Sequence, residues 1–292
     1  MTAFFYYLFL KPLSLLPMSV LHVVSDGLYL IVYSLVGYRK KVVRMNIENS
    51  FPDKSKEEID KMIKGFYGHF CDLIMESVKN FSISSEEAVK RCPTPDLEVF
   101  EKLYKEGKSF IFVGGHYANW EMFALSTAAI IPHAMAALYA PLTNQFFDKL
   151  IQETRGKTGL KLFPKNEPNE MFEMIKDGPT AFIFGADQSP SSLKKKIYWT
   201  NFLNQDTPVM LGTEKFAKKY DIPIVFGAIY RIKRGYYEFR ATLLTDKPSE
   251  TAEFEITELH TRVLEEQILT DPQYYLWTHK RWKHKREAVP TA

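Results

Sequence analysis

Cysteine is scarce in this sequence: the 292 residues contain only Cys71 and Cys92. Two cysteines make neither a disulfide framework nor a metal cluster, so both are expected to be buried thiols in a reducing compartment. An excess of charge of one sign is also lacking, because the net charge is only +3. So mild a balance gives no support for nucleic acid as a partner.

Motifs that mark several common enzyme classes are absent as well. The chain contains no P-loop and no glycine fingerprint of a dinucleotide-binding fold. It contains no His-Glu-x-x-His sequence, and no second histidine stands at ligand spacing from His116, so no metal is expected. No internal repeat or low-complexity linker is present, which favours one domain after the N-terminal tract.

Charge is nearly missing from residues 3–37, which form a long apolar tract. The tract is long enough for one membrane helix, and basic residues follow such a helix on its cytoplasmic side. The basic residues that follow here are Arg39, Lys40, Lys41 and Arg44. We therefore expect an N-terminal membrane anchor at residues 1–38 and a cytoplasmic domain at residues 39–292. Asp26 argues against a clean span, so a spanning helix and a helix lying partly in the interface both stay open.

The segment from Ser109 to Leu125 combines a strand, a turn and a helix. Residues 109–113 are a short run of apolar, aromatic and β-branched side chains, which is typical of a buried strand. Two glycines then permit a sharp turn, and the spacing becomes helical from Asn119. His116 is therefore expected at the carboxyl end of a strand, where ligands bind in open α/β sheets.

His116 and Glu121 form a candidate catalytic pair in this segment. Within one helix, residues five apart point in different directions, but across a loop-to-helix junction the histidine can fold back over the helix start. Glu121 would then hydrogen-bond one ring nitrogen and leave the other as a base near neutral pH. Such an imidazole activates a hydroxyl nucleophile. The alternative is a surface histidine beside an ordinary glutamate at the start of a helix.

The rest of the sequence alternates short apolar runs with helical spacing. Strands are predicted at 134–139, 160–163, 180–185, 222–230 and 236–243, and helices at 55–81, 84–91, 96–106, 144–155, 167–176, 209–220 and 251–269. Residues 46–53 are expected to be a link and residues 189–207 a long loop. This alternation predicts an α/β fold with a mostly parallel central sheet flanked by helices. The strand at 180–185 brings Asp187 and Gln188 to the same sheet edge as the candidate histidine.

Six elements in order along the chain carry a resemblance to a known family. They are Arg44…Asn46…Phe51-Pro52 after the apolar tract, Gly115-His116-Tyr117-Ala118-Asn119-Trp120-Glu121, Tyr139 with Pro141, Leu142 and Asn144, Arg155-Gly156, Asp187-Gln188-Ser189-Pro190, and Leu276-Trp277-Thr278-His279-Lys280-Arg281-Trp282-Lys283. On these residues the chain resembles the lipid A (late or secondary) acyltransferases of the lysophospholipid acyltransferase superfamily. Ala118 stands where that family usually has glycine, and Lys280 where it usually has arginine. The loop 191–207 also differs from the family, which leaves the acceptor open.

The resemblance implies a membrane-bound enzyme that transfers a fatty acyl chain from a thioester to a hydroxyl of a lipid A precursor. The thioester, carried by acyl carrier protein or coenzyme A, would be a co-substrate, and no cofactor is implied. His116 would take the hydroxyl proton while Glu121 fixes its ring. Asn119, or backbone N–H groups near Gly115, would stabilise the oxyanion. The enzyme would act on the cytoplasmic face of the inner membrane.

The same resemblance implies further substrate-binding residues and leaves competing functions open. Arg155 suits a phosphate on the lipid or the carrier. Asp187, next to Gln188, would orient the acceptor or brace Arg155, and a purely structural ion pair is the alternative. The acceptor can also be a lysophospholipid or an acylated amino-acid lipid. A non-catalytic membrane lipid-binding protein is the remaining reading, and the intact pair of His116 and Glu121 argues against it.

Overall fold

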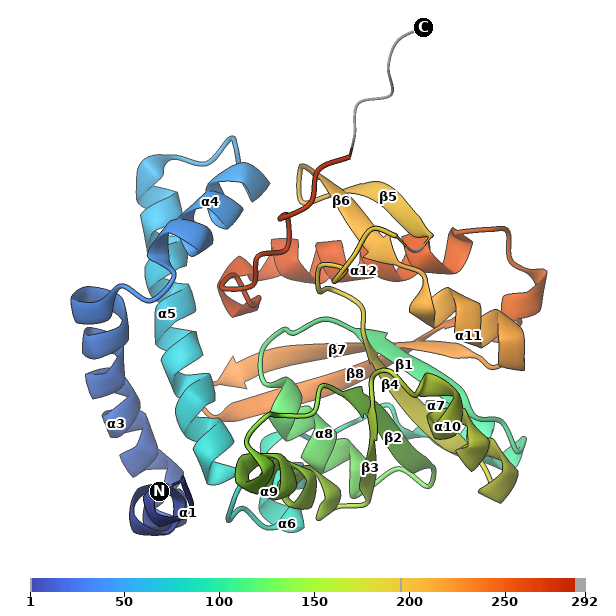
Figure 1. Ribbon diagram of the computed structural model, residues 1–292, viewed down its shortest axis with the longest axis horizontal. Coiled ribbons are helices and arrows are strands. Elements are labelled where there is room, and N and C mark those ends of the chain that lie inside the picture. Colours follow the sequence, from blue (N-terminus) through green and yellow to red (C-terminus); the bar gives the residue numbers. More distant parts are fainter. Residues whose placement is uncertain (1, 195, 287–292) are drawn as a thin grey trace, which may run out of the picture.

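A six-stranded sheet with the order β3-β2-β4-β1-β7-β8 forms the centre of the molecule in the computed structural model (Figure 1). Its strands are β1 (Phe110–Gly114), β2 (Ala134–Tyr139), β3 (Leu160–Pro164), β4 (Thr180–Gly185), β7 (Ile224–Lys233) and β8 (Tyr236–Thr245). All neighbouring strands run parallel except β7 and β8. The prediction of a mostly parallel sheet is confirmed. The structure describes residues 2–194 and 196–286; residues 1, 195 and 287–292, which the expected ranges include, lie outside the described residues.

Helices cover both faces of the sheet, and a cluster of aromatic rings lies on each face. On one face the ring of Phe112 in β1 packs against Phe110 and Phe239, with ring centres 4.8 and 5.4 Å away. On the other face Phe182 in β4 packs against Phe172 at 4.3 Å. Successive side chains of a strand alternate between faces, so adjacent strands supply both clusters. The first face carries α6 (Ser85–Arg91), α7 (Leu97–Lys105) and α8 (Trp120–Ala128); the second carries α10 (Pro168–Phe172), α11 (Gly212–Tyr220) and α12 (Glu255–Thr270).

The apolar N-terminal tract folds into successive helical segments beside the sheet domain (Figure 1). They are α1 (Thr2–Phe5), the π-helical turn η1 (Tyr6–Leu10), α2 (Lys11–Leu15), α3 (Met18–Tyr29) and a second π-helical stretch, η2 (Leu30–Val36). Among the described residues, Met18–Val36 is the one helix long and apolar enough to cross a membrane. Many of its large apolar side chains are exposed, including Val23, Leu35 and Val36.

Helix α5 (Lys56–Lys79) joins this tract to the rest of the molecule. It begins with a capping box, in which Ser55 Oγ accepts the Glu58 N–H and the Glu58 carboxylate accepts the Ser55 N–H at 2.8 Å. Helix α3 packs along α5. Arg234, from the turn between β7 and β8, forms ion pairs with both Asp26 of α3 and Asp72 of α5, each at 2.6 Å. The charge that interrupts the apolar tract is thus paired against the sheet domain.

The expected link at residues 46–53 is wrong, because most of it belongs to helix α4 (Lys40–Ser50). The buried residues of α4 are Val43, Asn46, Ile47 and Ser50, which recur at three and four and form one face. Two of the four are polar, and this hides the helical pattern in the sequence. Asn46 is buried because its Nδ2 donates to the carbonyl groups of Trp277 and His279, at 2.8 and 2.9 Å.

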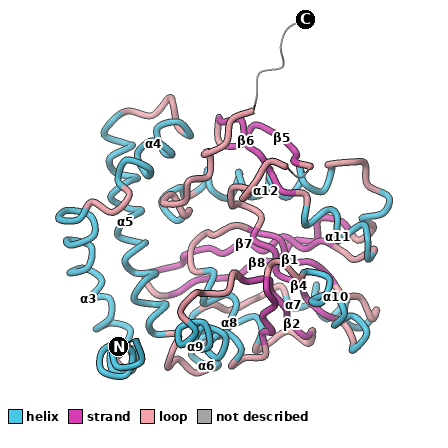
Figure 2. Tube along the Cα trace, viewed as in Figure 1, coloured by secondary structure: helices cyan, strands magenta, loops and turns pink. Residues whose placement is uncertain are grey.

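The expected long loop at residues 189–207 is wrong in its second half, which forms an antiparallel hairpin outside the main sheet (Figure 2). Its strands are β5 (Ile197–Phe202) and β6 (Gln205–Met210). The two turn residues, Leu203 and Asn204, both have positive φ, of 52° and 59°. A two-residue hairpin turn with both φ positive matches the right-handed twist of the strands. Because β6 extends to Met210, α11 begins at Gly212 and not at residue 209 as expected.

The segment from residue 271 to residue 282, here called the closing segment, connects parts of the chain that are distant in sequence. Its Tyr274 carbonyl accepts the Ala118 N–H at 2.9 Å, and the Leu276 N–H donates to the His116 carbonyl at 3.1 Å. The Thr278 carbonyl accepts from Arg39 at 2.9 Å. The closing segment therefore holds together the turn after β1 and the region following the N-terminal tract.

Candidate active site

The carboxyl ends of β1 and β4 lie side by side and position the two central residues of the site. The strands are parallel, and their register pairs Gly114 with Gly185. His116 and Asp187 each stand two residues further along, so the register of the sheet brings them together. Gly115 permits the close approach of α12 here, because a Cβ at this position would lie 2.7 Å from Leu264 Cδ1.

Asp187 holds His116 at two points. His116 Nδ1 lies 2.7 Å from Asp187 Oδ1, and the His116 backbone N–H donates to Asp187 Oδ2 at 2.9 Å. When Nδ1 donates to the carboxylate, the basic nitrogen of the ring is Nε2. The His116 side chain is 25% exposed, whereas that of Asp187 is 3% exposed. The ring also packs edge-on against Trp120, with the ring centres 5.1 Å apart.

The charges around His116 favour its protonated form. Burial alone would lower its pKa, but the charge and hydrogen bond of Asp187, together with the charge of Glu121, raise the pKa above its ordinary value of 6.5. Burial would raise the pKa of Asp187, but His116 and the nearby Arg281 lower it. An ionised carboxylate thus supports an imidazole that can accept a proton and hold it.

Glu121 binds Arg155, not the ring of His116. Arg155 Nε donates to Glu121 Oε2 at 2.9 Å and its terminal nitrogen donates to Oε1 at 2.5 Å, which makes a bidentate pair. Glu121 lies on the first turn of α8, and Arg155 lies near the end of α9 (Gln145–Gly156). The expected hydrogen bond between Glu121 and His116 is therefore corrected: Asp187 takes that position, and Glu121 acts on the histidine through its charge alone.

The two amides expected at the site differ in their surroundings. Asn119 is fully buried and caps α8: its Oδ1 accepts the Met122 N–H at 2.8 Å and its Nδ2 donates to Glu76 at 2.6 Å. Both polar atoms of this side chain are thus bound within the protein. Gln188 Nε2, in contrast, lies 3.4 Å from Nε2 of His116. Gln188 is the expected residue whose amide lies beside the basic nitrogen.

The turn between His116 and α8 has a left-handed residue at Ala118, whose φ is 50°. This region of φ favours glycine, which accounts for the glycine that the resemblance leads us to expect there. The Ala118 carbonyl accepts from His69 Nε2 at 3.2 Å, while its N–H is bound by the closing segment. His69 lies on α5, and no local sequence pattern connects it with the turn.

Two residues of the closing segment complete the surroundings of the pair. Arg281 is 2% exposed and donates to the Pro208 carbonyl at 2.8 Å, and His279 Nε2 accepts the Ser189 N–H at 3.0 Å. The motif that contains them was noticed in the sequence, but its position beside Asp187 was not. In the part of the chain that the structure describes, no group of three or more His, Cys, Asp or Glu side chains is placed to hold a metal ion.

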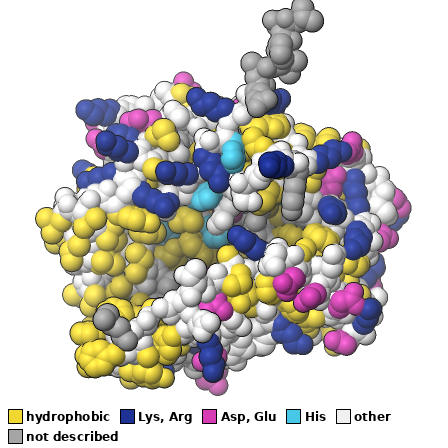
Figure 3. Space-filling view, viewed as in Figure 1, with side chains coloured by type: hydrophobic (Ala, Val, Ile, Leu, Met, Phe, Trp, Pro, Cys, Tyr) yellow, Lys and Arg dark blue, Asp and Glu magenta, His cyan; other side chains and the backbone are white. Residues whose placement is uncertain are grey.

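A hollow on one face of the molecule is lined by apolar side chains (Figure 3). Figure 3 shows the molecule hollowed between the N-terminal helices and the helices below the sheet, with hydrophobic side chains inside the hollow and histidine side chains at its upper end. The N-terminal helices contact α9 through aromatic rings: Tyr6 of η1 packs against Phe146 of α9 with ring centres 5.7 Å apart. An apolar surface of this kind suits a hydrocarbon chain better than a polar metabolite.

The fold and the site define an α/β enzyme with a histidine–carboxylate pair at the carboxyl edge of a mostly parallel sheet. A family model described as bacterial lipid A biosynthesis acyltransferase matches residues 1–284. The chain belongs to this family and is an acyltransferase, as the motifs along the sequence predicted.

Curated relatives agree with the family assignment at low identity. The chain is similar to a lipid A biosynthesis lauroyltransferase of Escherichia coli (strain K12), with 21% identity over 279 residues, 94% of this chain and 89% of the relative. It is similar to a lipid A biosynthesis palmitoleoyltransferase of the same organism, with 22% identity over 84% of this chain and 79% of the relative. A lipid A biosynthesis acyltransferase of Haemophilus influenzae is 23% identical over 92% of this chain and 86% of its own length.

Proposed function

We propose that this chain transfers a fatty acyl group from an acyl thioester to a hydroxyl of a lipid A precursor. The names of the relatives support lipid A as the acceptor class. The observation that carries the mechanism is the 2.7 Å contact between His116 Nδ1 and Asp187, because it orients the ring and leaves Nε2 as the base.

The reaction proceeds by direct transfer. The hydroxyl proton moves to His116 Nε2 as the hydroxyl oxygen bonds to the thioester carbonyl carbon. The tetrahedral intermediate then loses its C–S bond, and the proton passes from His116 to the departing thiolate. Asp187 stabilises the imidazolium between these steps, and general-base help of this kind is worth about a hundred- to ten-thousand-fold in rate. The amide of Gln188, beside Nε2, is the group best placed to donate to the oxyanion.

Glu121 and Arg155 serve substrate binding at the edge of the site. The bidentate pair fixes the guanidinium of Arg155 beside the first turn of α8, which carries Glu121. A guanidinium binds phosphate through paired N–H groups. A phosphate is present on lipid A precursors and on the carrier of the acyl thioester. Glu121 also adds negative charge near His116, which favours the protonated ring.

The chain works at a membrane, on the cytoplasmic face of the inner membrane. The exposed apolar side chains of α1 to η2 support this, because a soluble surface rarely carries so many in one region. Basic residues follow the tract directly, as they do at the cytoplasmic end of membrane segments. The donor thioester, on acyl carrier protein or coenzyme A, would then reach the site from the cytoplasm.

Two measurements test the function. The purified full chain is incubated with an acyl thioester and, in separate reactions, with a lipid A precursor, a lysophospholipid or an acylated amino-acid lipid. We expect transfer to the lipid A precursor by the wild-type chain and no transfer by the His116→Gln variant. Transfer only to another acceptor would refute the lipid A assignment, and no thioester turnover in any reaction would indicate a lipid-binding protein. Mass spectrometry of lipid A from a deletion strain should show a species lacking one acyl chain.

A further inference from the structure

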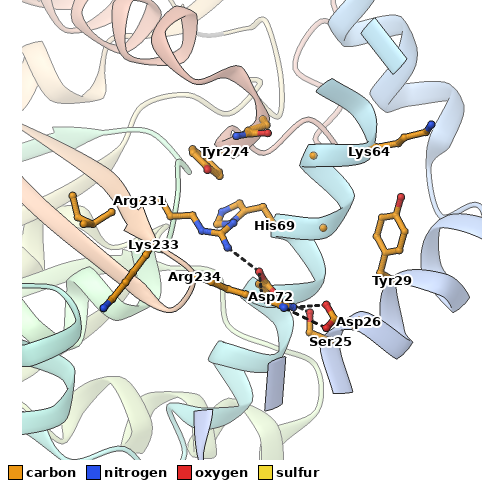
Figure 4. Close-up of a pocket in the computed structure, with 14 residues that line it drawn as sticks. Ser25, Asp26, Tyr29, Lys64, His69, Asp72, Arg231, Lys233, Arg234 and Tyr274 are labelled. Atoms are coloured by element: carbon orange, nitrogen blue, oxygen red, sulfur yellow. Dashed lines mark hydrogen bonds and ion pairs between the residues drawn. The ribbon is translucent and has the colours of Figure 1, made fainter. Parts of the chain in front are cut away.

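A second cavity, of about 590 Å³, lies between α3, α5 and the turn that joins β7 to β8 (Figure 4). Its walls include Ser25 and Asp26 from α3, Gly68 and His69 from α5, and residues 231–234 from the end of β7 and the turn. His116 and Asp187 are not among its lining residues. The cavity is therefore a separate site beside the apolar N-terminal tract.

Two glycines of α5 form part of the cavity wall. Glycine inside a helix costs about 1 kcal/mol relative to alanine, so its presence calls for a reason. At Gly65 the reason is packing, because a Cβ would lie 2.3 Å from Gln273 Oε1. At Gly68 nothing lies within 4 Å of such a Cβ. Packing within the protein does not explain Gly68, and its missing side chain keeps the cavity open.

The charges around the cavity leave an excess of two cations. Asp72 pairs with Arg231 at 3.1 Å, and Arg234 bridges Asp72 and Asp26. Two carboxylates are thus balanced by two guanidinium groups. The other charged lining residues are Lys64 and Lys233, and neither has an ion-pair partner among the described residues. Figure 4 shows Lys64 extending from α5 on the side of α3, whereas Lys233 extends from β7 away from Asp72, with its ammonium 4.4 Å from the centre of the Tyr236 ring. The cavity is suited to an anion.

The base of the cavity is connected to the turn that carries His116. His69 lines the cavity and donates from Nε2 to the Ala118 carbonyl at 3.2 Å. Tyr274 also lines it, and its carbonyl accepts the Ala118 N–H at 2.9 Å. The rings of His69 and Tyr274 pack edge-on, 4.9 Å apart. A group bound in the cavity thus touches the two side chains whose residues hold Ala118 in its left-handed conformation.

We propose that this cavity binds the phosphate ester headgroup of an anionic membrane lipid, at a site distinct from that of acyl transfer. The inference rests on the membrane association proposed above, because α3, which forms one wall, carries the exposed apolar face. Lipid chains would lie along that face while the phosphate enters between Lys64 and the β7–β8 turn. Attraction of basic side chains to anionic headgroups supplies the selectivity.

Filling the cavity is the first test. The full chain in detergent micelles is titrated with phosphatidylglycerol or phosphatidylcholine, and bound lipid is counted by native mass spectrometry. Wild-type protein should prefer phosphatidylglycerol. In Gly68→Leu the leucine side chain would occupy part of the cavity, and the preference should fall about tenfold, which corresponds to the loss of one good charged contact. Gly27→Leu is the matched control, because Gly27 also has nothing within 4 Å of an added Cβ but lies outside the lining. Equal binding by the two leucine variants would overturn the proposal.

Removing the two unpaired charges is the second test, and it does not alter the shape of α5. The double variant Lys64→Gln/Lys233→Gln should lose the preference for phosphatidylglycerol. Lys61→Gln/Lys102→Gln removes the same charge from exposed positions outside the cavity and should keep the preference. Loss in both double variants would reveal a general charge effect and overturn the proposal.

Two further arms separate this inference from its alternatives. Soluble glycerol phosphate should compete weakly, and binding as tight as that of phosphatidylglycerol would overturn the membrane source of the phosphate. The assay contains no thioester or acyl acceptor, so His116→Gln should leave lipid binding unchanged. Lipid binding without acyl transfer by the wild-type chain would refute the proposed function and leave this site standing.

Discussion

His116 and His69 both lie near carboxylates, and they differ in nearly every other respect. His116 has one ring nitrogen on Asp187 and the other beside an amide, at a partly open edge of the sheet. His69 is 3% exposed; its Nε2 donates to Ala118 and its Nδ1 faces Arg231 at 3.4 Å. Burial and then the charge of Arg231 lower the pKa of His69 to about 4, whereas Asp187 raises that of His116.

The comparison shows that a carboxylate near a histidine does not by itself make a base. Asp72 and Glu76 raise the pKa of His69, but burial and the arginine outweigh them. With both nitrogens bound inside the protein, His69 has no lone pair to offer a substrate. His116 Nε2 faces the neutral amide of Gln188 at a partly exposed position, and its Nδ1 has a carboxylate. Exposure and the charge of the neighbouring groups therefore separate a structural histidine from a candidate catalytic one.

The largest effect is expected for His116→Ala. Loss of the base should reduce kcat about a hundred- to ten-thousand-fold in a variant that still folds. Acyl transfer from a labelled thioester measures the rate. His69→Ala is the matched comparison. It should lower the free energy of unfolding, whereas its effect on turnover should be much smaller than that of His116→Ala. If His69→Ala abolished turnover in a folded protein and His116→Ala did not, the assignment of the two histidines would be reversed.

Asp187→Asn should reduce kcat by about a hundredfold, the lower end of general-base help, because the ring loses the charge that stabilises its protonated form. The pKa of His116 is raised in the wild type, so activity should rise with pH above 6.5 as the base loses its proton. Removing the carboxylate lowers that pKa, and the acidic limb of the kcat/KM profile should move to lower pH. A limb that stays in place would show that another group titrates there.

The two histidines should give opposite pH dependences of stability. The pKa of His69 falls on folding from 6.5 to about 4, so the unfolded chain binds more protons in this range. Stability is then lost as pH falls from 6.5 towards 4, by about 3 kcal/mol for this one group. The pKa of His116 rises on folding, so its contribution is full below 6.5 and is lost as pH rises through the folded-state value. Urea unfolding of His69→Gln between pH 4 and 7 should show a flatter slope than wild type, and an unchanged slope would contradict the assignment.

Glu121→Gln should reduce kcat/KM about tenfold, which is less than the effect of Asp187→Asn. The amide keeps the shape of the carboxylate but weakens the bidentate pair that holds Arg155. Most of the loss should appear in KM if the guanidinium binds substrate phosphate. Arg155→Lys, which keeps the charge without the fork, should show a similar rise in KM. A loss greater than that of Asp187→Asn would return Glu121 to the central role expected from the sequence.

The smallest effect is expected for Ala118→Gly, which should change the free energy of unfolding by less than about 1 kcal/mol. Glycine relieves the left-handed strain but also loses a buried methyl group and gains freedom in the unfolded chain. Ala181→Gly, at a fully buried position with ordinary φ in β4, should be clearly more destabilising. Equal losses in the two variants, measured by chemical unfolding, would argue against strain at Ala118.

Much of the fold could be predicted because the relevant signals are local. The strand at residues 134–139 and that at 180–185 coincide with β2 and β4, since apolar runs with flanking turn residues define them. The hairpin of β5 and β6 was missed because leucine and asparagine fill a turn that usually contains glycine. Helix α4 was missed because Asn46 and Ser50 are buried through distant partners.

The candidate site could be predicted in its composition but not in its pairing. His116, Asp187 and Gln188 were expected at one edge of the sheet, Glu121 beside the histidine, and Arg155 among the substrate-binding residues. Which carboxylate meets the histidine depends on the register of β1 and β4, and this is a long-range property. Gly114 and Gly185, which end the two strands, are paired in the sheet. His116 and Asp187 each stand two residues after these glycines, so the pairing brings the two side chains together. No local sequence pattern predicts the contact of His69 in α5 with the turn at Ala118.

The closing segment has a consequence for how this enzyme is made. The ribosome completes the turn containing His116 long before it reaches Tyr274 and Leu276, whose backbone groups bind that turn. Until those residues emerge, the turn that carries His116 lacks two of its backbone hydrogen bonds. Helices α3 and α5 are already synthesised by then. Competence for catalysis thus arrives late in translation, well after the apolar amino-terminal helices have been synthesised.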